Sequence, residues 1–166
     1  MKKPEDSGKH FEDFRKGQKL EGKVGRTITE TDNIWFTLLT NNSNQIHFNA
    51  DYAKRYFPGK PFEGRMAVNG FFTLGLVAGL LVDVTSANGF MLGIDKVKFL
   101  KPVFPGDTVY AGCEVVVVRP SSSQPGLGIV VIACWGLNQD GAKVIEFSRS
   151  FMVRKRKVVW GKKSRT

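Results

Sequence analysis

The sequence predicts an α+β fold in which one apolar helix packs against a sheet of four or five long antiparallel strands. Residues 70–85, GFFTLGLVAGLLVDVT, are apolar on nearly every face, which is typical of a helix that is covered on most sides. Three long β-rich runs then follow at 108–119, 127–139 and 142–156. A sheet of this length curling around one helix gives an α+β domain.

Composition and length indicate a single domain. The chain has 166 residues, of which 42% are hydrophobic, enough for one core. It contains no apolar stretch long enough to span a membrane, and its first residues lack the apolar segment of a signal peptide. Cys113 and Cys134 lie in β-like runs without metal-type spacing, so we expect two small buried thiols and no metal site. These features together favour a cytoplasmic protein.

The net charge of +10 raises the question of a nucleic-acid partner. Seven of the basic residues lie in 154–166, so the rest of the chain carries only about +3. A basic end of this kind is usually solvated, although it could also bind a polyanion. No RNA-recognition, zinc-finger or helix-turn-helix signature accompanies it, so a nucleic-acid role is not expected. We divide the chain into a flexible leader (1–9), a folded domain (10–156) and a basic tail (157–166).

The first half of the chain predicts two helices joined by a polar stretch. After an extended segment at 18–29, TETDNIWFTLLTN indicates a helix that either Thr29 with Asp32, or Thr31, could cap. The stretch NNSNQIHFNADY at 41–52 follows it. ADYAKRYF at 50–57 is typical of a short helix, which the prolines and glycines at 58–64 end.

The second half predicts the long helix and then the sheet. Gly75 and Gly79 lie one turn apart on the helix and would let another backbone approach closely. The run DKVKFLKPVF alternates as a strand does. NQDG at 138–141 is a strong hairpin signal, and PSSSQPG at 120–126 forms a longer turn.

The order of these motifs resembles one known family. The segment NSNQIH at 42–47, the helix opening VNGFF at 68–72 and the strand motif VKFLKPVFPGD at 97–107 match, in order and spacing, the motifs of the MaoC-like dehydratases, which include the (R)-specific enoyl-CoA hydratases. The resemblance covers about residues 10–155. It implies a hotdog fold, in which a curved antiparallel sheet wraps the central helix. RTITETDNIWFTLLTNN and VNGFFTLGL are most similar to the mesaconyl-CoA hydratase or β-methylmalyl-CoA dehydratase branch.

Three positions depart from the usual family pattern. Asn42 stands where the family has its catalytic aspartate, Asn69 where a histidine is usual, and Ala78 where the central helix often supplies a serine. The mesaconyl branch also accepts asparagine at the first of these positions. The departure still removes the second titratable group of the site.

Hydration of an enoyl thioester needs a base that takes a proton from water and a donor for the charge that grows on the thioester oxygen. Histidine titrates near neutral pH, which makes His47 the candidate base. The Gly70 N–H, at the start of the apolar helix, is the candidate oxyanion donor. Asn42 is the candidate group for holding the water. Alternatively, His47 only binds loop backbone, and the asparagines form turns.

Further residues are expected around this centre. Asn44, Asn69, Lys54, Arg55 and Arg65 are candidates for substrate binding, with the three cations meeting the phosphates of coenzyme A; ordinary surface charge would explain them equally well. Coenzyme A enters only as part of the substrate, and no other cofactor is expected.

The expected reaction is the reversible hydration of a 2-enoyl-CoA to a 3-hydroxyacyl-CoA, and the acyl group could be branched or dicarboxylic. The alternative is a hotdog acyl-CoA thioesterase or a non-catalytic acyl-CoA-binding subunit. Because a single hotdog sheet has exposed edges, we expect a homodimer or a higher even oligomer.

Overall fold

The computed structural model describes residues 8–156, so the tail at 157–166 and most of the leader lie outside the described residues. The helical elements are η1 (Phe11–Asp13), α1 (Glu30–Leu39), η2 (Gln45–His47), α2 (Ala50–Tyr56) and α3 (Gly70–Leu80). The strands are β1 (Lys19–Glu21), β2 (Arg26–Thr27), β3 (Gly89–Phe99), β4 (Thr108–Pro120), β5 (Leu127–Leu137) and β6 (Lys143–Arg154). This composition confirms the α+β class.

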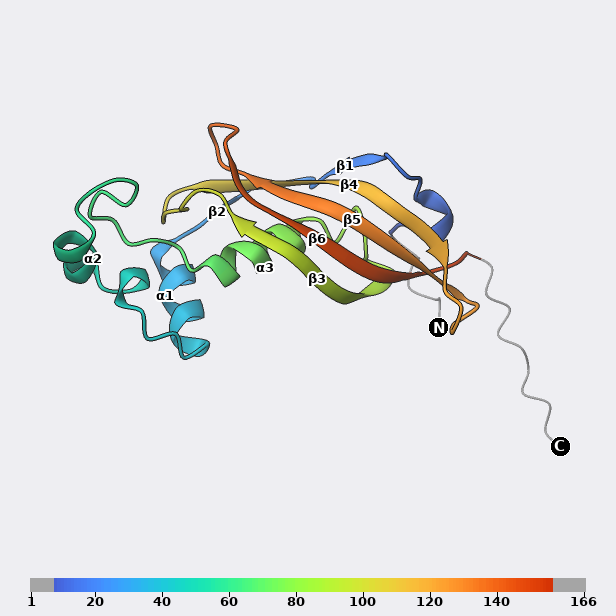
Figure 1. Ribbon diagram of the computed structural model, residues 1–166, viewed down its shortest axis with the longest axis horizontal. Coiled ribbons are helices and arrows are strands. Elements are labelled where there is room, and N and C mark those ends of the chain that lie inside the picture. Colours follow the sequence, from blue (N-terminus) through green and yellow to red (C-terminus); the bar gives the residue numbers. More distant parts are fainter. Residues whose placement is uncertain (1–7, 157–166) are drawn as a thin grey trace, which may run out of the picture.

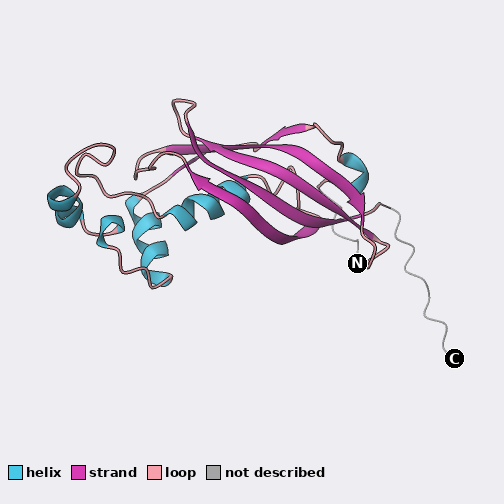
Figure 2. Cartoon of the chain, in the orientation of Figure 1, coloured by secondary structure: helices cyan, strands magenta, loops and turns pink. Residues whose placement is uncertain are grey.

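The strands form one antiparallel sheet in the order β1-β4-β5-β6-β3, and β2 pairs with β4. The predicted NQDG turn joins β5 to β6, and the left-handed backbone that such a turn requires falls on Gly141. Figure 1 shows the sheet as a curved layer with α3 along one face, while α1 and α2 lie beyond the end of the sheet. Figure 2 shows that the longer helices share one side of the molecule.

The main core lies between the sheet and α3. Val77 and Leu81 from the helix region pack with alternate residues of the long strands, including Val115, Ile132 and Phe151. Both cysteines belong to this core, as the sequence predicted: they face each other across β4 and β5 and are free thiols. Burial raises the pKa of Cys113 to about 11 and that of Cys134 to about 12, because a thiolate is poorly solvated there.

Helix α3 is shorter and less covered than the sequence predicted. It ends at Leu80 rather than at residue 85, and the chain then runs through turns to β3. Within the helix only Thr73 and Val77 are buried, whereas Phe71 is 69% exposed. A single layer of sheet covers only one side of a helix, so the other side of α3 is open in the isolated chain.

Strand β3 also differs from the expectation. It begins at Gly89, six residues before the predicted run, and Lys96 has a positive φ of 55° at a register shift between Asp95 and Lys98. This bulge interrupts the alternation of side chains. The strand lies at the edge of the sheet, and its region exposes six large apolar side chains: Phe90, Met91, Leu92, Val97, Phe99 and Leu100.

Helix α1 is fastened at its first turn. Thr29 caps it, and the Asp32 carboxylate accepts from the Thr29 N–H at 2.9 Å, so the capping box is the one of the two predicted caps that forms. The guanidinium of Arg26, on β2, lies 2.7 Å from the same carboxylate. The hydrogen bond from the Thr29 N–H lowers the pKa of Asp32, and the hydrogen bond and charge of Arg26 lower it further. The start of α1 is thereby tied to the sheet.

Candidate active site

His47 ends the 3-10 turn η2, which follows the loop after α1. Asn44 begins this turn by accepting a hydrogen bond from the Ile46 N–H, and buried Ile46 anchors it in a small apolar cluster with Ala53 and Ala67. The His47 ring is half-buried, and its Nδ1 lies 2.9 Å from the Ala67 carbonyl oxygen. A carbonyl can only accept, so Nδ1 carries the proton. In the neutral ring, Nε2 therefore keeps its lone pair, as a general base requires.

The start of α3 is formed by Asn69 and Gly70. Asn69 is 2% exposed, and its side-chain oxygen accepts from the Phe71 N–H at 3.0 Å. Its amide nitrogen donates to the Thr37 hydroxyl at 3.2 Å. Asn69 is thus the N-cap of α3, and its expected role in substrate binding stays a prediction.

The Gly70 N–H is placed as an anion donor should be. It is in the first turn of an apolar helix, and within residues 8–156 it has no hydrogen-bond acceptor. A Cβ at Gly70 would lie 3.0 Å from the Phe99 ring of β3, so glycine lets the sheet edge approach here. The oxyanion role of Gly70 remains a prediction.

Two buried side chains of α1, which we did not single out from the sequence, connect these segments. Asn33, fully buried, donates through Nδ2 to the carbonyl oxygens of His47 at 2.7 Å and Ala67 at 3.0 Å. Its Oδ1 accepts from the Asn69 N–H at 2.8 Å. Thr37, one turn later, binds the Asn69 side chain, and its carbonyl oxygen accepts from the Asn42 N–H at 3.0 Å. The sequence did offer a signal that could have identified them, because Asn33 and Thr37 are polar residues spaced i, i+4 in the otherwise apolar stretch NIWFTLL.

Asn42 lies in the loop between α1 and η2. Its side-chain oxygen accepts from the Asn44 N–H at 3.0 Å, while its amide nitrogen makes no hydrogen bond to any residue in 8–156. The nitrogen is therefore a free donor, as holding a water or a substrate oxygen requires. Asn44 is exposed and uses its own side-chain oxygen to cap η2. The functional roles expected for both asparagines stay predictions.

Two of the predicted cations, Lys54 and Arg55, lie on α2, and Arg65 lies in the segment between α2 and α3. Arg55 pairs with Asp51 at 2.9 Å within α2, and both side chains are exposed. Lys54 is exposed on the same helix. The Arg65 guanidinium stacks 3.7 Å from the centre of the Phe104 ring and lies 3.8 Å from the Glu63 carboxylate. Stacking leaves the edge N–H groups of a guanidinium available for an anion; the coenzyme A role of all three stays a prediction.

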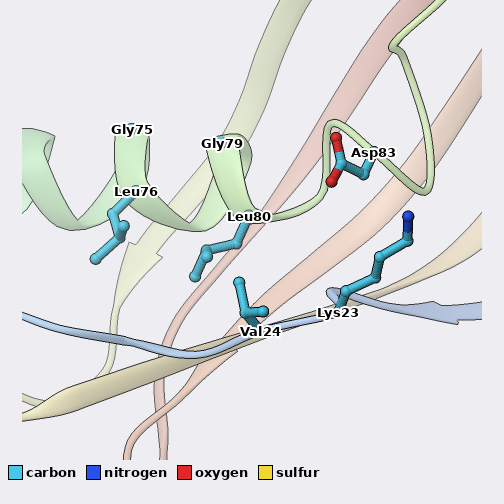
Figure 3. A pocket seen from close by; sticks show the side chains of 7 residues that line it. All are labelled: Lys23, Val24, Gly75, Leu76, Gly79, Leu80 and Asp83. Carbon is cyan, nitrogen blue, oxygen red and sulfur yellow. The ribbon is translucent and has the colours of Figure 1, made fainter.

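A groove of about 450 Å³ runs along the open side of α3 (Figure 3). Figure 3 shows Gly75, Leu76, Gly79 and Leu80 of the helix on one side of it and Val24 on the other. Lys23 and Asp83 lie together at one end of the groove (Figure 3). A Cβ at either glycine would contact nothing within 4 Å, so the two glycines border open space rather than a second backbone.

Within residues 8–156, no three His, Cys, Asp or Glu side chains are grouped closely enough to hold a metal ion. In the same range, every helix is too short or too polar to cross a membrane.

Comparison with known protein families matches the MaoC-like domain to residues 13–130. The chain belongs to this family. Mesaconyl-CoA hydratase of Cereibacter sphaeroides is 32% identical over 153 residues, which are 91% of this chain and 43% of that protein. β-Methylmalyl-CoA dehydratase of Chloroflexus aurantiacus is 31% identical over 90% of this chain and 41% of that protein. (R)-specific enoyl-CoA hydratase of Rhodospirillum rubrum is 32% identical over 67% of this chain and 72% of that protein.

Solved structures confirm the hotdog fold. A MaoC-domain dehydratase from Chloroflexus aurantiacus superposes with a TM-score of 0.82 at 28% identity, over 99% of this chain and 46% of that one. A Mycobacterium tuberculosis protein with a double hotdog fold matches with a TM-score of 0.79 at 19% identity, over 94% of this chain and 47% of that one. This MaoC-like chain therefore spans less than half the length of its mesaconyl-CoA and β-methylmalyl-CoA relatives.

Proposed function

We propose that this MaoC-like chain catalyses the reversible hydration of a 2-enoyl-CoA thioester to the 3-hydroxyacyl-CoA. The observation that carries the proposal is His47, whose Nδ1–H is held by the Ala67 carbonyl at 2.9 Å, so that Nε2 can act as a base. The buried asparagine of α1 links this histidine to the N-terminus of α3. A base combined with a free N–H at a helix start is what addition of water to a conjugated thioester needs.

In the hydration direction, His47 Nε2 takes a proton from water while the water oxygen bonds to C3 of the substrate. The C2–C3 π electrons move toward the thioester, and the negative charge that grows on its oxygen is stabilised by the Gly70 N–H. The imidazolium then returns the proton to C2, so one water is added and His47 is regenerated. Asn42 orients the water through its free amide nitrogen and adds no second charge.

The substrate class follows from the relatives. Their names give mesaconyl-CoA, β-methylmalyl-CoA and an enoyl-CoA as substrates. We therefore propose an enoyl-CoA with a short acyl group, which could be branched or dicarboxylic. Lys54, Arg55 and Arg65 would meet the phosphates of coenzyme A, and no further cofactor is required. The same proposal includes a cytoplasmic location, which two unpaired buried thiols favour.

The proposal also includes a homodimer or a higher even oligomer that pairs through β3. This edge strand and Leu100, which directly follows it, carry the six exposed apolar side chains described above, and unpaired edges of this kind favour association. Phe99 lies against Gly70, so a copy paired at this edge would also adjoin the start of α3. Sedimentation should give a mass of at least twice 18.5 kDa.

The double variant Met91→Lys/Val97→Lys should sediment as a monomer, because it places charges on the paired edge. Val24→Lys is the matched control: Val24 is 65% exposed but lies by β1, at the opposite edge. A stable wild-type monomer at micromolar concentration would contradict this part of the proposal.

The second candidate is an acyl-CoA thioesterase or a non-catalytic acyl-CoA-binding subunit. Asn42 favours it, because the side chain cannot titrate and leaves His47 without a carboxylate partner at that position.

One assay separates the two candidates. The purified chain is incubated with crotonyl-CoA and with mesaconyl-CoA, and both the absorbance of the conjugated thioester and the free thiol are followed. Loss of absorbance without thiol is the result expected for a hydratase. Release of thiol identifies a thioesterase, and binding without either change identifies a non-catalytic subunit.

A further inference from the structure

We propose that Asn33 is a positioning residue for the hydration, because its single amide fixes both the direction of the His47 base and the start of the helix that presents the Gly70 N–H. The inference rests on the proposed function for its kinetic consequences. Its structural part, the state of the His47 ring, can be tested without any activity.

The first step concerns the His47 ring. The Ala67 carbonyl that accepts from His47 Nδ1 also accepts from Asn33 Nδ2, at 2.9 and 3.0 Å. The other hydrogen of the Asn33 amide goes to the backbone carbonyl of His47 itself, at 2.7 Å. One amide therefore holds both the backbone that carries the ring and the acceptor that orients it. A ring fixed in this way has its Nε2 lone pair in one direction.

The second step concerns the start of α3. The Asn33 side-chain oxygen accepts from the Asn69 N–H at 2.8 Å, and Asn69 caps the helix that begins at Gly70. The position of the free Gly70 N–H relative to His47 is thus set through the same side chain. A general base and an oxyanion donor must act on atoms of one substrate, so their relative placement decides how much each contributes.

The third step is that Asn33 is itself rigid. The side chain is fully buried, and all three hydrogen bonds that it makes are to backbone groups. It lies in the first turn of α1, directly after Asp32, whose carboxylate is bound by Thr29 and Arg26. A buried amide with this many partners has one orientation, because rotating it would leave polar groups unpaired.

The test uses nitrogen-15 spectra of the histidine rings. The chain has only two histidines, so His47 is assigned by comparison with the variant His47→Ala. In the wild type, above the pH at which the ring is protonated, His47 should be the Nδ1–H tautomer, which is the less populated one in free histidine. In Asn33→Ala the ring should change to a mixture of tautomers, and kcat for crotonyl-CoA hydration should fall about 10- to 100-fold, with little change in KM.

Thr85→Val is the matched control for general loss of stability. Thr85 is fully buried and donates to the Leu81 carbonyl at 2.5 Å, beyond the far end of α3 from the site. It should lower the melting temperature yet leave both the His47 tautomer and kcat unchanged. If Asn33→Ala lowers the melting temperature but keeps the wild-type tautomer and kcat, Asn33 is only structural and the inference is wrong.

Two further outcomes are informative. If Asn33→Ala does not fold, Asn33→Ser takes its place with the same expected changes in tautomer and kcat. An Nε2–H tautomer of His47 in the wild type would overturn the inference with either variant. If the tautomer changes as expected but no variant, nor the wild type, hydrates any enoyl-CoA, the positioning of the ring is supported while the proposed reaction fails.

Discussion

Replacement of His47 separates its structural contribution from its chemical one. The ring makes one hydrogen bond, to the Ala67 carbonyl, and is half-buried. Losing one such bond costs about 1 kcal/mol of unfolding free energy, so His47→Ala should fold. A positioned general base contributes about 10²- to 10⁴-fold to a rate, which corresponds to about 3–5 kcal/mol of activation free energy. The kinetic loss should therefore far exceed the loss of stability.

The variant His47→Asn sharpens this comparison. Its amide nitrogen can take the place of Nδ1 and donate to Ala67, but the side chain cannot accept a proton near neutral pH. We expect His47→Asn to melt closer to the wild type than His47→Ala does, and to hydrate crotonyl-CoA as slowly. The measurements are thermal melts and the initial loss of enoyl-thioester absorbance at saturating substrate.

Near-wild-type hydration by either variant would refute the assignment of His47 as the base. Asp51 and Glu63 would then be tested, although Asp51 is paired with Arg55 on the exposed face of α2. If both variants lose stability and activity in equal measure, the histidine acts only on the fold.

Three further predictions concern other parts of the chain. Asn42→Ala should lower kcat less than loss of the base does, on the order of tens-fold, because it removes orientation and one or two hydrogen bonds; the same absorbance assay measures it. Asp32→Asn should destabilise the protein near neutral pH by about 1 kcal/mol, the usual value of a cap. The folded-state pKa of Asp32 is lowered, chiefly by the Thr29 N–H, so its stabilisation is present above the ordinary value of 3.8 and is lost as the pH falls below it. Thermal melts of wild type and variant should accordingly converge in acid, and a constant difference would contradict this. Cys113 and Cys134 should not react with a thiol reagent near pH 8 in the folded protein, since burial raises both pKa values, and both should react in denaturant; fast labelling of the native protein would be the contrary result.

The arrangement gives α1 a larger part than its length suggests. Its first turn is tied to the sheet through Arg26 and Asp32, and its buried side chains bind the segments that carry the candidate base and the helix start. The site is thus assembled on a helix, and the loop at 40–49 is oriented by that helix. Residues on rigid elements hold catalytic geometry better than residues on free loops.

The sequence by itself determined the class of fold and the order of its elements. The β-rich composition of the runs that became β4, β5 and β6, the NQDG turn, and the capping signal of Thr29 with Asp32 are local signals. Each depends only on neighbouring residues. The same is true of the candidate base, since His47 is the histidine that lies in the family motif. Those features could be read before any contact was known.

Only the tertiary structure decided which groups meet and which remain free. That Ala67 orients the His47 ring, and that Asn33 binds residues 14, 34 and 36 positions away, depends on contacts between distant segments. The same reason explains the two misjudged elements. The extent to which the sheet covers α3 and the bulge at Lys96 on the edge strand β3 both follow from the curvature and pairing of the whole sheet. The local periodicity of the sequence contains no information about either.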